Sequence, residues 1–87
     1  MKILLAEDDC RIAQSLTEAL ADQQYLVDAV ADGQEGWDFV TAFTYDLLIL
    51  DVTLPKLDGI SLCRRLRSQG NRVPVMMLTA RDTPTDK

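Results

Sequence analysis

Short runs of apolar residues alternate with amphipathic stretches along this chain. Residues 3–6 and 47–50 are uniformly apolar, and each run ends at acidic side chains. Runs of this length are too short for helices, and without alternation they are typical of strands buried on both faces of a parallel sheet. Residues 25–30 contain aromatic and β-branched side chains, which predicts a further strand. Residues 73–79, with Pro74 near the start, make a fourth.

Helical periodicity fills the intervals between these strands. Apolar residues recur every four positions at Ile12, Leu16 and Leu20, which predicts an amphipathic helix that begins near Asp9 as its N-cap. We predict two further helices, one over residues 34–43 and one that contains Leu62 and Leu66 and ends near Ser68. Strands that alternate with helices favour parallel pairing and helices on both faces of the sheet. The sequence therefore predicts a doubly wound α/β fold.

Composition places this chain among compact single domains. It has 87 residues, of which 47% are hydrophobic and 26% charged, and this balance is too apolar for a disordered segment. The net charge of −5 argues against a nucleic-acid-binding surface. Two cysteines without any histidine make a zinc site an unfavourable interpretation, and we expect both to be small buried or half-buried side chains. The N-terminus resembles neither a signal peptide nor a membrane span, so we expect a soluble cytoplasmic protein.

Three acidic residues follow predicted strands: Glu7 and Asp8 come after the first, and Asp51 comes after the third. Ligands of open α/β sheets bind at the carboxyl ends of the strands, where the strand order reverses. If these two strands are neighbours, the carboxylates converge and repel one another unless a cation is present. Such oxygen ligands suit Mg²⁺ and predict phosphoryl chemistry, with Asp51 as the nucleophile and the hydroxyl of Thr79 as a donor.

These acids also have an ordinary explanation. Loops that follow strands are polar in any α/β protein, and Asp8 or Asp9 would then only cap the next helix. Asp51 differs because it directly follows four apolar residues, a costly place for a charge unless something binds it. Thr79 alone carries little weight, since threonine is favoured in strands.

Three segments resemble the signature segments of response-regulator receiver domains in order and spacing. They are KILLAEDD, LLILDVTLPKLDGISLCRRLR and VPVMMLTA, and they extend over nearly the whole chain. The resemblance implies a flavodoxin-like sheet with strand order 2-1-3-4-5, of which about four strands and three helices would lie here. Within the family, these segments are most similar to the winged-helix transcription-factor branch.

The resemblance also implies a role for individual residues. Asp51 would accept a phosphoryl group from a phosphohistidine on a partner histidine kinase. Glu7, Asp8 and Asp51 would bind Mg²⁺, with the backbone carbonyl of Thr53 as a further ligand. Thr79 matches the switch hydroxyl that moves toward the phosphoryl group.

Receiver domains continue beyond the matched segments through a fourth helix, a fifth strand and a fifth helix. We therefore expect residues 1–87 to form the N-terminal portion of such a domain. The family's lysine after the fifth strand has no counterpart in Lys56 or Lys87, and phosphorylation would be slower without its charge. The strand at 73–79 would then be an open sheet edge through which we expect self-association. We expect contact with DNA only through an effector domain that is absent from these residues. We expect no contact with a membrane.

Three functions follow from these observations. The leading hypothesis is a Mg²⁺-dependent phosphorelay receiver that, in full-length form, regulates transcription. The alternative is a non-catalytic truncated fragment that self-associates or binds a partner without phosphotransfer. A small phosphohydrolase with a DxD pair after a strand is disfavoured because Asp51 is followed by Val52 and Thr53.

Overall fold

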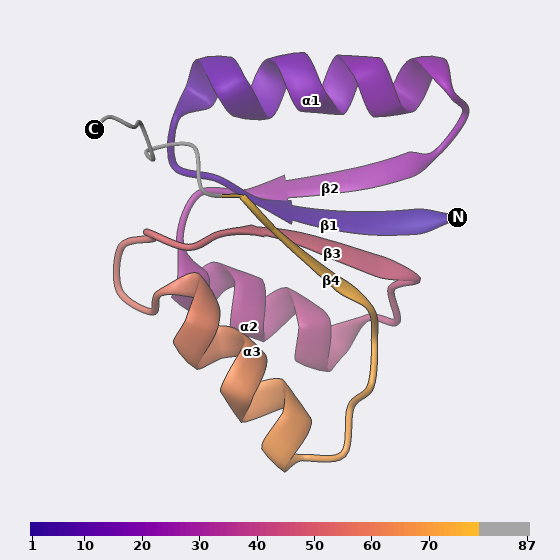
Figure 1. Cartoon of the computed structure of the whole chain (residues 1–87). Helices are drawn as coiled ribbons and strands as arrows, with labels where there is room; N and C mark the ends of the chain where they lie inside the picture. The colour runs from indigo at the N-terminus through magenta and orange to yellow at the C-terminus, as the bar shows by residue number, and fades with distance from the viewer. Residues whose placement is uncertain (79–87) are drawn as a thin grey trace, which may run out of the picture.

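Four strands and three helices alternate in residues 1–78, which are the residues that this computed structural model describes (Figure 1). The predicted alternation is confirmed. The strands are β1 (Lys2–Ala6), β2 (Leu26–Val30), β3 (Leu47–Asp51) and β4 (Val75–Leu78). The helices are α1 (Cys10–Asp22), α2 (Gly33–Ala42) and α3 (Gly59–Ser68).

The sheet is parallel throughout, with strand order β2-β1-β3-β4. The strand order reverses at β1, because β2 and β3 flank it on opposite sides. This is the doubly wound, flavodoxin-like arrangement that we predicted, and it places the switch point between β1 and β3. Ala6 of β1 is in register with Leu50 of β3, so the residue that follows each of them reaches the same edge of the sheet.

Helices cover both faces of the sheet: α1 lies on one face, and α2 and α3 lie together on the other (Figure 1). Ile3, Leu5 and Ile49 form the core beneath α1, whereas Leu4 and Leu50 belong to the core beneath α2 and α3. Successive residues of β1 and β3 thus enter different cores. Because both faces of β1 and β3 are buried, these strands lack the polar residue at every second position that a half-exposed strand has.

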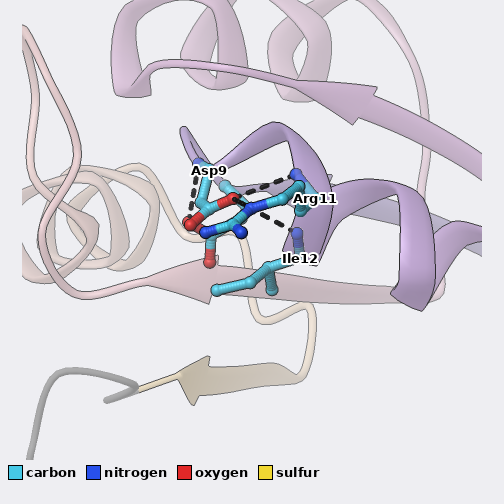
Figure 2. A network of polar contacts seen from close by, with 4 residues as sticks. Asp9, Arg11 and Ile12 are labelled. Atoms are coloured by element: carbon cyan, nitrogen blue, oxygen red, sulfur yellow. Dashed lines mark hydrogen bonds and ion pairs between the residues drawn. The ribbon is translucent and has the colours of Figure 1, made fainter.

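An aspartate caps the N-terminus of each helix. Asp9, Asp32 and Asp58 precede α1, α2 and α3, and each side chain accepts hydrogen bonds from backbone amides of the first turn. Figure 2 shows the first of these caps, in which Oδ1 of Asp9 accepts from the amides of Arg11 at 2.9 Å and Ile12 at 3.4 Å. The predicted N-cap at Asp9 is confirmed, and the cap directs the chain from the acidic segment into α1.

The prediction for the fourth strand was wrong at its start, because β4 begins at Val75 and not at residue 73. The carbonyl of Val73 accepts a hydrogen bond from Nη1 of Arg67 at 2.7 Å. Pro74 has no amide hydrogen for a ladder, and the regular strand therefore starts one residue later. Thr79, which we assigned to the end of this strand, lies outside the described residues.

Two further expectations need correction. The second helix runs over Gly33–Ala42, and Phe43 is extended and 51% exposed, so it does not share the buried face of that helix. We expected both cysteines to be buried or half-buried, which holds for Cys63, whereas Cys10 is exposed. None of the helices in residues 1–78 has both the length and the apolar character that a bilayer span requires.

Candidate functional site

The switch point brings together the three acids that the sequence analysis identified. Glu7 and Asp8 follow β1, and Asp51 is the last residue of β3. One carboxylate oxygen from each of these residues lies within 4.8 Å of the other two. This separation allows a single small cation to contact all three side chains. The predicted convergence of Glu7, Asp8 and Asp51 is therefore present in the structure.

Two of the three carboxylates are buried, which is unusual for ionisable groups. Glu7 is 3% exposed and Asp51 is 2% exposed, whereas Asp8 is exposed. The main chain supports this placement, because the amide of Glu7 donates to the carbonyl of Val30 at 3.1 Å. The two buried side chains thus lie at the end of the sheet, with the third acid at the solvent boundary.

Each buried carboxylate has one oxygen that is hydrogen bonded and one that is not. Oε2 of Glu7 accepts from the amide of Asp9 at 3.0 Å, and Oδ1 of Asp51 accepts from the amide of Thr53 at 3.2 Å. Within residues 1–78, Oε1 of Glu7 and Oδ2 of Asp51 are buried without a hydrogen-bond partner. Unpartnered buried carboxylate oxygens are costly. Their chemistry fits a hard divalent cation such as Mg²⁺, which prefers oxygen ligands.

The electrostatics of the cluster perturb the titration of Glu7. Burial raises the pKa of the Glu7 carboxyl, and the hydrogen bond from the amide of Asp9 opposes this rise. The neighbouring charge of Asp51 and the close approach of the Asp51 and Asp8 carboxyl groups raise the pKa of Glu7 further. A carboxyl in this position holds a proton more readily than usual. A bound cation would favour the ionised form and release that proton.

The loop after β3, residues 52–58, packs closely on the strand that it leaves. The amide of Gly59 donates to the carbonyl of Val52 at 3.0 Å, and a Cβ on Gly59 would lie 2.3 Å from the carbonyl oxygen of Asp51. Only glycine permits this approach of helix and strand. The glycine at the start of α3 thereby lets this helix begin directly against the end of β3.

The remaining predicted site residues have different outcomes. Thr53 lies beside Asp51 as expected, and its observed contact is made by its amide, so the predicted role of its carbonyl stays a prediction. Thr79, the predicted switch hydroxyl, lies outside the described residues. The side chains of Asp32 and Lys56 form an ion pair beside this region, and no pattern discussed above pointed to them. The dipeptide Asp32-Gly33 is a turn signal, and it is the local feature of the sequence that could have done so.

Comparison with known proteins identifies the class to which this fold and site belong. The family model described as the response regulator receiver domain matches residues 3–87. The chain belongs to the response-regulator receiver-domain family, as the resemblance of its sequence segments predicted.

Individual relatives agree with this assignment. Protein RcaC of Microchaete diplosiphon is 54% identical over 87 residues, which are all of this chain and 13% of RcaC. The receiver domain of the Francisella response regulator 1452 has a TM-score of 0.89 at 35% identity, covering 99% of this chain and 71% of that one. Response regulator TrrA of Thermotoga maritima, in complex with Mg(2+)-BeF, has a TM-score of 0.86 at 29% identity, covering 91% of this chain and 69% of that one. The chain thus spans only a small part of RcaC.

Proposed function

We propose that this chain is a phosphorelay receiver in which Asp51 accepts a phosphoryl group. The observation that carries the proposal is a pair of buried oxygens at the switch point, on Glu7 and Asp51, that have no hydrogen-bond partner within residues 1–78. Because the fold buries these groups without satisfying them, a ligand that supplies positive charge is expected there. Membership of the receiver-domain family supports the same interpretation.

Glu7, Asp8 and Asp51 would hold the divalent cation, with Oε1 of Glu7 and one oxygen of Asp51 as the buried ligands. The backbone carbonyl of Thr53 is the further ligand that the family resemblance implies. Mg²⁺ in such a site neutralises the charge that gathers on phosphoryl oxygens. The magnesium complex of TrrA supports this choice of ion.

The chain's own residues would act as follows. A carboxylate oxygen of Asp51 attacks phosphorus while the bond from phosphorus to its donor breaks, which leaves an aspartyl phosphate. The amide of Thr53 holds the carboxylate in orientation through Oδ1. Thr79 is proposed as the switch hydroxyl, a role that rests on the family resemblance of its segment.

The donor that we propose is a phosphohistidine on a partner histidine kinase, in the cytoplasm. The output would be regulation of transcription through a winged-helix effector domain elsewhere in the full-length protein. This proposal rests on the resemblance within the family. That these residues are the N-terminal part of a receiver domain stays a prediction as well.

Phosphorylation in vitro tests the proposal directly. The chain is incubated with a small acyl phosphate and Mg²⁺, and its intact mass is measured. We expect one added phosphoryl group on the wild type, none after removal of Mg²⁺ by a chelator, and none on Asp51→Asn. Asp38→Asn, a change at an exposed acid of α2, is the matched control and should be labelled like the wild type. A labelled Asp51→Asn variant, or an unlabelled wild type, would contradict the proposal.

The exposed edge of the sheet favours a second candidate, a non-catalytic fragment that associates with another copy of itself. Within residues 1–78, β4 pairs only with β3, and Met76 on this strand is 52% exposed. Unpaired strand edges with apolar side chains are sites of strand pairing between chains. A chain that associates through β4 could also be phosphorylated, so association alone does not separate the two functions. The intact-mass measurement does, because only a phosphorelay receiver gains a phosphoryl group.

A further inference from the structure

The loop of residues 52–58 is tied to the start of α2 by two contacts. Nζ of Lys56 lies 3.7 Å from Oδ2 of Asp32, and the amide of Gly33 donates to the carbonyl of Pro55 at 3.1 Å. The side chain of Asp32 is only 19% exposed. A Cβ on Gly33 would lie 1.6 Å from a carbonyl oxygen of the loop, so the two backbones touch here.

Lys56 adopts a backbone conformation that favours glycine. Its φ is +70°, and the amide of Leu57 donates to the carbonyl of Pro55 at 2.7 Å, which makes Lys56 the centre of a three-residue turn. A residue with a side chain is strained there, and such strain persists only where the surroundings hold it. Glycine would relieve the strain but would lack the ammonium group that reaches Asp32.

The segment between β2 and α2 also contacts the strand that carries the other acids. The amide of Glu7 donates to the carbonyl of Val30, and Asp32 follows only two residues later. One short segment therefore contacts both the end of β1 and the loop that follows Asp51. The pair formed by Asp32 and Lys56 strengthens the link between that segment and the loop.

We propose that Asp32 and Lys56 are positioning residues whose ion pair holds the loop of residues 52–58 in place and thereby raises the affinity of the acid cluster for a divalent cation. This inference rests on the proposed function and adds a contact that sets how tightly the same site binds its cation. Asp51, from which the loop starts, is repelled by the carboxylates of Glu7 and Asp8, and this repulsion favours conformations in which the end of β3 and the loop move away from β1. A contact that opposes this movement lowers the cost of assembling the ligands.

Long-range charge effects make a different prediction, which allows a sharp test. Lys56→Gln removes a positive charge at this end of the sheet, so charge alone would strengthen Mg²⁺ binding. Asp32→Asn removes a negative charge and would weaken it. A positioning role predicts that both substitutions weaken binding. Asparagine also keeps the Oδ1 acceptor that caps α2, where the amide of Glu35 donates at 2.7 Å, so Asp32→Asn isolates the ion pair.

The experiment is a titration of the full chain with Mg²⁺, followed by the amide NMR shifts of the residues around Asp51. We expect Lys56→Gln and Asp32→Asn each to weaken Mg²⁺ binding about two- to fivefold, the range of an exposed ion pair. The double variant should be no weaker than either single variant, because both remove the same contact. Lys56→Arg should stay within about twofold of the wild type, since it keeps the charge. Arg64→Gln, at an exposed position of α3, is the control and should bind like the wild type.

Ionic strength separates positioning from a simple loss of fold. The ratio of wild-type to Lys56→Gln affinity should fall to one near 1 M salt, where the Debye length is about 3 Å. A partly unfolded variant would keep its defect at every salt concentration and would show it in the amide spectrum. Lys56→Gln that binds Mg²⁺ as tightly as the wild type or more tightly, or additive losses in the double variant, would overturn the inference. A wild type that binds no Mg²⁺ would instead overturn the proposed function.

Discussion

At the scale of single residues, the site depends on how each buried carboxylate is partnered. Glu7 and Asp51 each have one oxygen bound to a backbone amide two residues further along, at Asp9 and Thr53. This contact fixes the orientation of the carboxylate, and the second oxygen then faces the cluster without a partner among residues 1–78. The cluster therefore stores electrostatic repulsion in the absence of a cation, and a ligand that relieves it gains affinity.

The raised pKa of Glu7 predicts that Glu7→Gln stabilises the metal-free protein at neutral pH. The folded state holds a proton on Glu7 more tightly than the unfolded state, whose pKa lies near the ordinary 4.5. Stability of the wild type therefore falls as the pH rises from about that value through the raised pKa. We expect Glu7→Gln to melt several degrees higher than the wild type at pH 7 without metal, by an amount that shrinks toward zero below pH 4.5.

Thermal unfolding across this pH range, with and without Mg²⁺, is the measurement. Mg²⁺ should raise the melting temperature of the wild type and have little effect on Glu7→Gln, which has lost a ligand charge. A variant that is less stable than the wild type at pH 7, or a difference that grows as the pH falls, would show that Glu7 is not under electrostatic strain.

Individual site residues differ in how far the sequence could predict them. Glu7, Asp8 and Asp51 follow strands whose apolar runs are clear, and parallel strands bring their carboxyl ends to one edge. The pairing of Asp32 with Lys56 could not be predicted in this way. It depends on a positive φ at Lys56 and on a backbone approach at Gly33, which are properties of the packed structure rather than of local sequence.

At the scale of secondary-structure elements, the caps define where the helices begin. Capping matters most for α1, which has no buried residue and is the only helix of residues 1–78 on its face of the sheet. A helix held by less tertiary packing depends more on its local signals. The cap of α1 also adjoins the acid cluster, because the amide of the capping residue, Asp9, donates to Oε2 of Glu7 at 3.0 Å.

Asp9→Ala should therefore destabilise the chain by about 1 kcal/mol, because two backbone amides at the start of α1 lose their acceptor. For a domain of this size, that loss corresponds to a melting temperature about 4–8 °C lower. Asp9→Asn retains a side-chain acceptor and should cost little, so it serves as the control. Equal melting temperatures for Asp9→Ala and the wild type would mean that the cap does not stabilise α1.

Element boundaries show what local pattern predicts and what it misses. The start of α1 followed from a capping aspartate before an amphipathic run, and the structure agrees. The start of β4 did not, because Val73 fits a strand by type, yet its carbonyl accepts from Arg67. A guanidinium that reaches the main chain of a following segment is a tertiary contact, and no periodicity reveals it.

At the scale of the whole molecule, the two edges of the sheet that residues 1–78 form differ in the side chains that they carry. β2 forms one edge, where Tyr45 donates to Asp28 at 2.6 Å and gives the strand a polar contact. At the other edge, β4 carries Met76, which is paired in register with buried Ile49 and is itself 52% exposed. Apolar side chains at an edge strand favour association of chains over a monomer in water.

We predict that the chain self-associates in a concentration-dependent way and that Met76→Lys shifts it toward the monomer. A charge at an edge strand opposes pairing with a second chain, and the exposed position of Met76 makes the change tolerable for folding. Size-exclusion chromatography with light scattering gives the mass of each species. Gln69→Lys, an added charge at an exposed position after α3, is the control and should leave the mass unchanged. A wild type that remains a cooperatively melting monomer at all concentrations would rule out this association.

The most direct test of the central claim is to locate a bound divalent ion. Mn²⁺ added to the full chain broadens the NMR signals of amides close to it. We predict selective broadening at residues 7–9 and 51–53 that Mg²⁺ reverses by competition and that Asp51→Asn removes. Broadening at another acidic position, such as Asp46 at the opposite end of β3, or no selective broadening at all, would contradict a cation site built from Glu7, Asp8 and Asp51.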